Sequence, residues 1–438
     1  MSAESLFAPD FREEPYWWDA ARPLDEEPES LPAKIDVAVI GAGLTGLNTA
    51  LVLARAGRGV AVFDKGDLGQ GASSRNAGYV GRSLKHSFGE IAKRFGLERA
   101  IAVYREMQRA FEAVGEVIES EQIACQFKIC GRVIMARSAS QYDDLARELE
   151  LKRQHLGDDY AMISREALGT EIATDRFFGG ALVPNMGSLH PGLYQRGLLD
   201  RARAQGAILL GQTPVERITP NGKSGGFMLA TPRGAVQARE VFVATNGYSG
   251  AAFSWLRRRL IPFDAYMIAT EPLPAERMSR LLPQDRTFID HAHNIIFMRR
   301  SPDGARILFG GRTGSRMTSL KAKAAEIHTL AGSVVPGFAE LKLSHAWTGR
   351  CAGTFDLYPH IGTHDGIHFA AGYCFAGVPM GTYLGRLAAQ RILGRPARTL
   401  FAERRFPTVP FYSGNPWFVP AAMAIYDWRD RRDRRARP

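Results

Sequence analysis

The chain has 438 residues, of which 45% are apolar and 23% charged, the composition of a folded protein with room for about two or three domains. The N-terminus shows no secretory signal, no apolar run reaches the roughly 20 residues of a membrane span, and four cysteines without a CxxC pair favour a reducing, cytoplasmic compartment. The net charge of +11 admits nucleic acid, an acidic membrane or an anionic substrate as partners, so charge alone excludes none of them.

The first 33 residues are acidic and aperiodic, and they predict an arm that lies over the surface of the protein. We expect Tyr16-Trp17-Trp18 to anchor this arm, because aromatic side chains in such a segment usually serve as packing contacts.

Residues 35–64 predict a complete βαβ unit, with a β-branched strand, a G-x-G-x-x-G turn, a helix, and a second strand that ends on Asp64. In such a unit Gly41 allows the tight turn, Gly43 lets the backbone approach a pyrophosphate, and Gly46 lets the helix pack closely. The helix N-terminus then faces the phosphates, and Asp64 can accept hydrogen bonds from a ribose. The pattern therefore predicts a dinucleotide site.

A run of small and polar residues, 69–78, follows Asp64 and Lys65 and lacks a helical period. A nicotinamide-dependent domain would normally begin its next helix here. This run instead allows the backbone to lie along an extended ligand, with Arg75 and Asn76 offering polar contacts. A solvated loop is the alternative.

Residues 87–119 predict one long amphipathic helix, and two short strands and a further helix follow up to residue 155. The buried strand that begins at residue 240 ends in a turn of small residues, 244–247. Three histidines at 360, 364 and 368 lie among proline and glycine, so they cannot share one helical face, and we expect no metal site.

The segments 41–64 and 71–78, with later stretches near Val241 and Gly372, resemble the FAD-dependent amine and amino-acid oxidases. This is the D-amino acid oxidase, glycine oxidase and sarcosine oxidase superfamily, and the γ-glutamylputrescine oxidase type is the nearest likeness. The resemblance implies an α/β fold, with a Rossmann-like FAD-binding domain and an interleaved antiparallel-sheet substrate domain.

The expected division of the chain follows from this resemblance. An N-terminal arm takes 1–33, the FAD-binding domain 34–86, 187–254 and 350–396, the substrate domain 87–186 and 255–349, and a C-terminal extension 397–438.

The expected FAD contacts lie in the glycine turn, the residues after Asp64, a strand edge beside the adenine, the turn after residue 243, and the start of the last core helix. They are Gly41, Gly43, Leu44, Thr45, Gly46, Asp64, Lys65, Gly71, Ala72, Ser73, Ser74, Arg75, Asn76, Val215, Ala244, Thr245, Asn246, Gly372, Gly377 and Val378. The N-terminus of the helix after Pro379 would point at the flavin pyrimidine and favour its reduction.

Candidate catalytic residues are Trp347, Arg350 and Cys351. Relatives that oxidise amino acids hold the substrate carboxylate with an arginine at the place of Cys351, and Arg350 would face the other side of the strand. This departure favours an amine over an α-amino acid. Cys351 is also two residues away from the cysteine that carries flavin in sarcosine oxidase-type relatives, so FAD is expected to bind without a covalent bond.

The expected function is oxidation of a primary or secondary amine, with a polyamine derivative as one candidate, to an imine that hydrolyses. Reduced flavin would pass its electrons to dioxygen. The same-fold alternative is a dehydrogenase that uses a quinone or an electron-transfer protein, because Leu308 stands where oxidase relatives hold a lysine.

The C-terminal segment 417–428 and the arginines after it suggest a weak peripheral membrane contact, with a helix packed on the protein's own surface as the alternative. Two other functions have less support. A flavoprotein acting on RNA lacks an RNA-binding motif, so no nucleic-acid partner is expected. A non-catalytic FAD protein does not explain flavin-facing segments that are complete.

Overall fold

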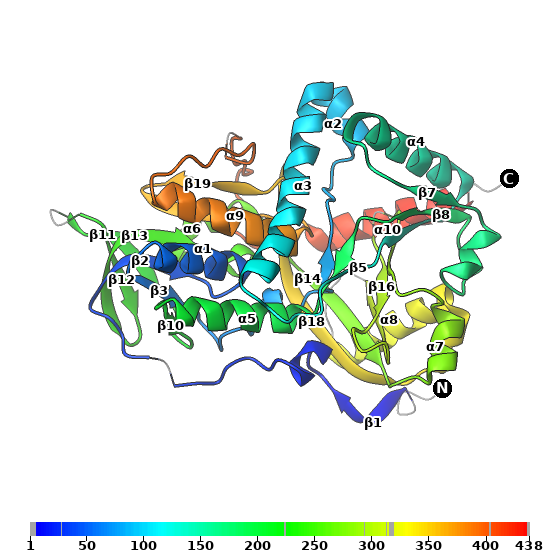
Figure 1. Ribbon diagram of the computed structural model, residues 1–438, viewed down its shortest axis with the longest axis horizontal. Helices are drawn as coiled ribbons and strands as arrows, with labels where there is room; N and C mark the ends of the chain where they lie inside the picture. The colour runs from blue at the N-terminus through cyan, green and yellow to red at the C-terminus, as the bar shows by residue number, and fades with distance from the viewer. Residues whose placement is uncertain are drawn as a thin grey trace.

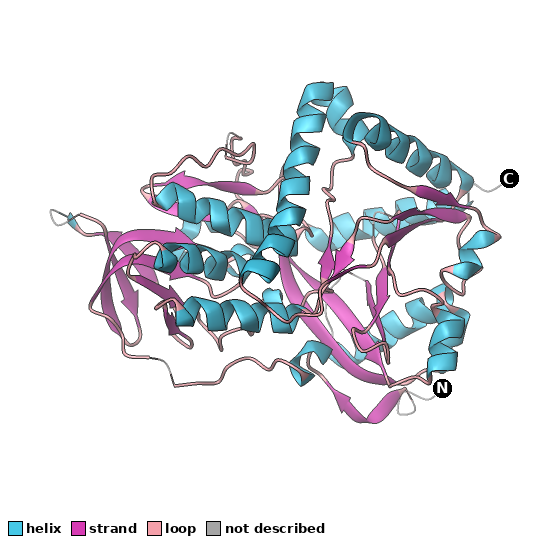
Figure 2. Cartoon of the chain, in the orientation of Figure 1, coloured by secondary structure: helices cyan, strands magenta, loops and turns pink. Residues whose placement is uncertain are grey.

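The computed structural model describes residues 6–27, 29–222, 225–292, 294–311, 313–314, 319–402 and 404–435. Two large sheets dominate this part of the chain, and Figure 1 shows them at opposite ends of the molecule. Figure 2 shows helices packed on both.

One large sheet has eight strands and is built on the predicted βαβ unit. Its central strands are parallel, and Val37, Ala38 and Val39 have no exposed surface, which explains their continuous apolar sequence. In spatial order the strands are β10 (Ile208–Leu210), β3 (Val60–Phe63), β2 (Lys34–Ile40), β13 (Gly234–Val243), β12 (Phe227–Thr231) and β11 (Arg217–Pro220), with β20 (Ile367–Ala371) on β13 and β19 (His360–His364) on β20. The associated helices are α1 (Leu44–Arg55), α5 (Pro191–Ala204) and α9 (Gly377–Ile392), of which α5 and α9 pack on α1.

The other large sheet has nine strands, and most of its pairings are antiparallel. Its longest contact joins β14 to β18 from Leu260↔Thr354 to Thr270↔Leu343. In spatial order the strands are β1 (Phe7–Arg12), β18 (Leu343–Thr354), β14 (Leu260–Thr270), β17 (Ile307–Gly311), β16 (Phe297–Arg300), β15 (Thr287–Asp290), β6 (Arg132–Ala136), β8 (Gly179–Val183) and β7 (Ala161–Ile163). Helix α8 (Leu320–Val334) packs on β14, and α7 (Ala275–Leu281) contributes Met278 and Leu281 to the same core.

A third, small sheet has three strands, and three further helices belong to the N-terminal half of the chain. Its strands are β4 (Tyr79–Val80), β9 (Gly187–Ser188) and β5 (Lys128–Ile129), and the helices are α2 (Phe88–Phe95), α3 (Leu97–Ser120) and α4 (Ala139–Leu156). The prediction of one helix over 87–119 is wrong, because Gly96 adopts φ +91° and separates α2 from α3.

The N-terminal arm contacts both large sheets. Its first part, β1, pairs parallel to β18 at the sheet edge, which the aperiodic sequence does not predict. Trp17 is fully buried with Met267, Leu308 and Trp347, as expected of an anchor. The arm then runs along one edge of the molecule towards β2 (Figure 1), and Leu24 N donates to the Leu68 carbonyl at 3.0 Å.

The division into domains remains a prediction, and two elements cross its expected boundaries. Strand β18 continues past residue 350, and β1 of the arm belongs to the nine-stranded sheet. The C-terminal extension ends in α10 (Val419–Arg435), and no helix among the described residues is long and apolar enough to cross a membrane.

The burial of Trp17 leads to a stability prediction. Replacing Trp17 by alanine should lower the free energy of unfolding by about 3–5 kcal/mol, because it empties a fully buried volume between the arm and the sheet. Denaturant titration measures this change. Trp417→Ala is the matched control, because that ring is 77% exposed, and the change should stay within about 0.5 kcal/mol. Equal effects of the two substitutions would contradict the anchoring role.

Candidate active site

The glycine turn between β2 and α1 has the geometry of a phosphate-binding turn. Gly41 adopts φ +106°, and a Cβ at Gly46 would lie only 2.0 Å from the Gly41 carbonyl oxygen. Gly43 is the N-cap of α1 and brings no side chain of its own to cap the helix. The amide of Leu44 donates to Ser73 Oγ, so the next amides, Thr45 N and Gly46 N, are the ones that can face an anion. A Cβ at Gly43 would lie 2.8 Å from Ser73 Oγ, so a side chain here would displace the hydroxyl that bonds to Leu44 N.

Asp64 lies where β3 ends and is bound by backbone amides. Its Oδ2 accepts from Ala42 N at 2.8 Å, and its Oδ1 accepts from Gly66 N at 3.1 Å. Burial raises the pKa of Asp64, and these two amide hydrogen bonds oppose that rise. Each carboxylate oxygen has a second lone pair, so the predicted ribose contact remains compatible with this geometry. Lys65 Nζ lies 5.1 Å from the ring centroid of Tyr248.

The second predicted segment, Gly71–Asn76, lies against the start of α1. It contains the short 3₁₀ helix η3 (Ala72–Ser74), and Ser73 Oγ accepts from Leu44 N at 3.0 Å. Asn76 Oδ1 accepts from Gly78 N at 2.8 Å and so shapes the following turn. The structure therefore brings the two cofactor motifs together.

Arg75 connects this segment to the substrate sheet. Its Nη1 donates to the Thr348 carbonyl at 3.1 Å, its carbonyl accepts from Trp347 Nε1 at 2.9 Å, and its guanidinium carbon lies 4.4 Å from the Trp18 ring centroid. Burial lowers the pKa of Arg75. These contacts are structural, so a direct contact of Arg75 with the cofactor remains a prediction.

The strand edge predicted to flank the adenine is also near Asp64. Thr213 N donates to the Asp64 carbonyl at 2.7 Å, which brings the segment containing the half-buried Val215 to the end of β3. Ala244 N in turn donates to the Ile40 carbonyl at 2.8 Å, so the turn after β13 lies beside the glycine turn.

Two turns from distant parts of the chain meet where the flavin ring is expected. Asn246 adopts φ +41°, and its Oδ1 accepts from Gly372 N at 2.9 Å. Thr245 Oγ1 lies 2.8 Å from Ser249 Oγ in the same turn. Gly372 adopts φ +78°, and a Cβ there would lie 2.2 Å from Thr354 Cγ2. This position therefore requires glycine.

Helix α9 begins beside α1. The hydroxyls of Thr45 and Tyr373 are 2.6 Å apart, and a Cβ at Gly381 would lie 3.1 Å from Thr45 Oγ1. The N-cap of α9 is Ala376, which offers no side-chain cap, and a Cβ at Gly377 would meet nothing within 4 Å. The two helix starts, including the predicted contacts Gly377 and Val378, thus lie together, and their dipoles make one region of positive potential.

The three candidate catalytic residues lie on β18 and face two ways. Arg350 Nε donates to Asp264 Oδ1 at 3.2 Å on the neighbouring strand. Cys351 pairs with Phe263, and burial raises the pKa of its thiol to about 12, so this thiol is neutral. Trp347 is buried beneath Trp17 and bonded to Arg75.

Sequence reasoning missed Lys85, Phe263 and Phe375. Phe375 has a half-exposed ring, and Lys85 Nζ lies 4.4 Å from its centroid. No periodic or motif signal marks Lys85, since it lies in an aperiodic run, and only the fold brings it to the turn before α9.

The three histidines examined for metal binding have separate partners. His360 Nε2 lies 3.0 Å from Asp356 Oδ1, His364 stacks on Trp255, and His368 Nε2 lies 3.3 Å from Glu240 Oε2. Among the residues that the structure describes, no group of three or more His, Cys, Asp or Glu could hold a metal ion.

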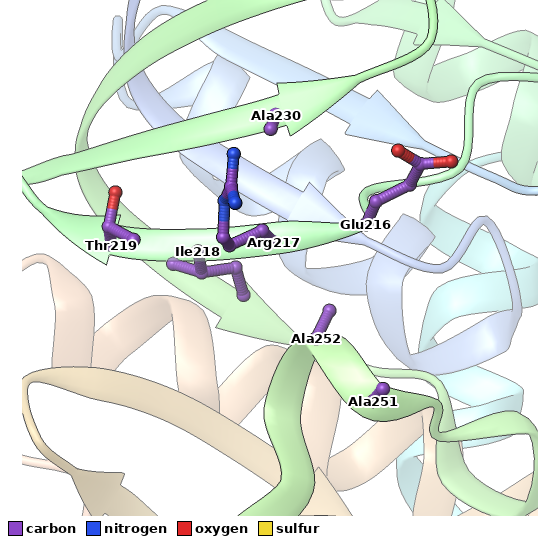
Figure 3. A pocket seen from close by; sticks show the side chains of 7 residues that line it. All are labelled: Glu216, Arg217, Ile218, Thr219, Ala230, Ala251 and Ala252. Carbon is purple, nitrogen blue, oxygen red and sulfur yellow. The ribbon is translucent and has the colours of Figure 1, made fainter.

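A pocket of about 590 Å³ lies along β11, and its lining begins at Glu216, the residue after the predicted contact Val215. Figure 3 shows it against β11, with Ala230 of β12 and two alanines of the 3₁₀ helix η7 (Ala251–Phe253) on its walls. It is lined by Glu216, Arg217, Ile218, Thr219, Ala230, Ala251 and Ala252. None of these is a predicted site residue, so we locate the active site from the two helix starts and β18.

The fold and this site define an oxidoreductase that binds a flavin dinucleotide. The glycine turn, the uncapped start of α1 and the buried carboxylate fit the pyrophosphate and ribose, and the start of α9 fits the flavin pyrimidine. Residues 36–391 match the DAO family of FAD dependent oxidoreductases, and the chain belongs to this family.

Known proteins agree with this assignment over most of the chain. γ-Glutamylputrescine oxidoreductase of Escherichia coli (strain K12) is 30% identical over 419 residues, covering 93% of this chain and 95% of that protein. Glycine oxidase of Bacillus licheniformis is 26% identical over 390 residues, covering 84% and 96%. The crystal structure of glycine oxidase from Geobacillus kaustophilus superposes with a TM-score of 0.70 at 21% identity, covering 86% of this chain and 99% of that chain.

These likenesses confirm the predicted family and fold class, and the family match confirms the FAD cofactor. The protein is an FAD-dependent oxidoreductase of the amine and amino-acid oxidase type.

The close packing at Gly46 leads to a prediction about cofactor content. Gly46→Ala should greatly reduce the flavin that copurifies with the protein, because its Cβ cannot fit 2.0 Å from a backbone oxygen and the turn must shift. The ratio of flavin to protein absorbance measures this. Gly169→Ala serves as the control, because its Cβ would meet nothing within 4 Å. Full flavin content in Gly46→Ala would refute this placement of the pyrophosphate.

Proposed function

We propose that the protein oxidises a primary or secondary amine to an imine, which then hydrolyses to a carbonyl compound, and that dioxygen reoxidises the flavin. FAD, when bound, supplies the acceptor for the hydride equivalent from the carbon beside the nitrogen. A polyamine derivative is one candidate substrate, since the enzyme from Escherichia coli that shares 30% identity is a γ-glutamylputrescine oxidoreductase.

The observation that carries this proposal is the charge arrangement on β18. A neutral, half-buried thiol, Cys351, stands where the resemblance places the arginine that clamps an α-carboxylate. Arg350 cannot replace that arginine, because neighbouring residues face opposite sides of a strand and because Arg350 pairs with Asp264. A site without this clamp suits an amine better than an α-amino acid.

The chain's own groups would orient the amine and exclude water. Trp347 and Met267 are fully or almost fully buried beside Leu308 and Trp17, which gives the substrate sheet an apolar wall. The free amides at the start of α9 would stabilise negative charge on the reduced flavin pyrimidine. Neither task needs a general base, and an amine that arrives unprotonated needs no further proton transfer from the protein.

A dehydrogenase that passes electrons to a quinone or an electron-transfer protein is the second candidate. Leu308 has no exposed surface and lies among apolar side chains, so this position holds no cation that could promote reaction with dioxygen. The half-exposed or more exposed side chains of Trp417, Ile425 and Trp428 would support a peripheral membrane contact of a quinone-linked enzyme. The alternative to a membrane contact is packing of α10 on the protein itself. A Cβ at Gly314 would lie 3.0 Å from Met423 Cγ, so α10 lies close to the backbone at this glycine. We place the reaction in the cytoplasm, with nucleic acid excluded as a partner.

An anaerobic titration tests the reaction and the acceptor together. Amines and α-amino acids are added to the purified yellow protein without oxygen, and flavin absorbance is followed. We expect amines to bleach the flavin and glycine or D-alanine to leave it oxidised. Admission of air should then restore the colour and yield peroxide. Slow recovery would favour the dehydrogenase, and bleaching by α-amino acids alone would overturn the amine assignment.

The state of the Cys351 thiol predicts that FAD is bound without a covalent bond. Burial keeps this thiol neutral, and a neutral thiol is a poor nucleophile towards the flavin ring. Acid precipitation should therefore leave the yellow colour in the supernatant. Colour that stays with the pellet in the wild type and is released in Cys351→Ser would show attachment at this residue.

A further inference from the structure

Lys85 is a half-buried cation that no described carboxylate neutralises. It lies between β4 and α2, and its Nζ is 4.4 Å from the ring centroid of Phe375. Its basic neighbours do have protein acceptors. Arg82 Nη1 donates to Asp158 Oδ1 at 2.7 Å, and His86 Nε2 lies 2.9 Å from the Asp356 carbonyl oxygen. Burial lowers the pKa of Lys85, and Cys374 partly opposes this change.

The turn that carries Phe375 is strained and held in place. Cys374 and Phe375 adopt φ +47° and +77°, left-handed conformations that are unfavourable for residues with a side chain. Cys374 N donates to the Ala352 carbonyl at 3.3 Å, and Gly372 N donates to Asn246 at 2.9 Å. As a result, a large apolar ring remains 50% exposed directly before the start of α9.

An apolar surface connects this turn to Cys351. Phe263 lies directly opposite Cys351 in the β14–β18 pair, and opposed residues point to the same side of a sheet. The ring centroids of Phe263 and Phe375 are 5.1 Å apart. From Cys351, two phenylalanine rings therefore lead to the ammonium group of Lys85.

We propose that Lys85 binds an anionic group of the substrate, a carboxylate that several carbons separate from the reacting nitrogen. The rings of Phe263 and Phe375 contact the chain between the two groups. This assignment rests on the proposed function, and it adds the class of amine. A desolvated ammonium without a counter-ion is unfavourable, so an anion that reaches it restores the lost interaction. Relatives are expected to hold a cation at the place of Cys351, where this chain has none, and Lys85 supplies a cation farther along the site.

Two amines of equal length separate this role from a structural one. Anaerobic flavin reduction is measured with 5-aminopentanoate and with n-pentylamine, which lacks the carboxylate, in wild type, Lys85→Met, Lys85→Arg and Lys93→Met. In Lys85→Met we expect the apparent Kd for 5-aminopentanoate to rise at least about tenfold, and that for n-pentylamine to stay within about twofold. Lys85→Arg should restore part of the affinity. Lys93, an exposed lysine on α2, is the matched control and should change neither value.

Other outcomes overturn the assignment in distinct ways. Equal losses for both amines in Lys85→Met show a structural role, and unchanged binding of the acid shows that Lys85 does not contact it. If neither amine reduces the wild-type flavin, the proposed function fails, and calorimetric titration with glutarate then tests Lys85 alone. Binding of glutarate that weakens about tenfold in Lys85→Met supports the anion site. Absent or unchanged binding refutes it.

Discussion

The close packing of α1 against α9 is the constraint on which the site depends. A Cβ at Gly385 would lie 2.4 Å from the Thr45 carbonyl, and Thr49 Oγ1 donates to the Gly385 carbonyl at 2.8 Å. Only a residue without a side chain allows the two helices to approach this closely. The approach brings two helix starts, separated by most of the chain, close to each other. An FAD molecule has a charged centre and a redox-active ring that acquires charge, and we expect one helix start to serve each.

Strand β18 connects both helix starts to the nine-stranded sheet. It bonds to the cofactor segment through Trp347 and Arg75, and it bonds to the turn before α9 through Ala352 and Cys374. The same strand places Cys351 opposite Phe263 and Arg350 against Asp264. Substrate choice and cofactor placement therefore share one rigid element, which suits a reaction in which the protein's main task is positioning.

The sequence signals for the cofactor half of the expected site are local, and the structure brings the segments that carry them together. The turn 41–46, the strand ending at Asp64 and the small-residue segment 71–76 each combine a conformational requirement with a chemical one in a few residues. The expected substrate half depends on pairings between distant segments. The sequence alone gives no reason to select Lys85, because only the fold brings it to the ring of Phe375. The break at Gly96 is a smaller example of a feature that the sequence pattern does not predict. The apolar periodicity continues across residue 96, but the helical backbone ends there.

The parallel pairing of β1 with β18 has a consequence for biosynthesis. Phe7 leaves the ribosome early, but its partner Leu343 appears only when most of the chain has been made. Contacts between such distant segments form slowly, since a long loop must close first. The arm must therefore wait undocked during translation, with Trp17 still exposed to solvent. Because β18 also orders the active site, completion of the substrate sheet and docking of the arm belong to the same late folding event.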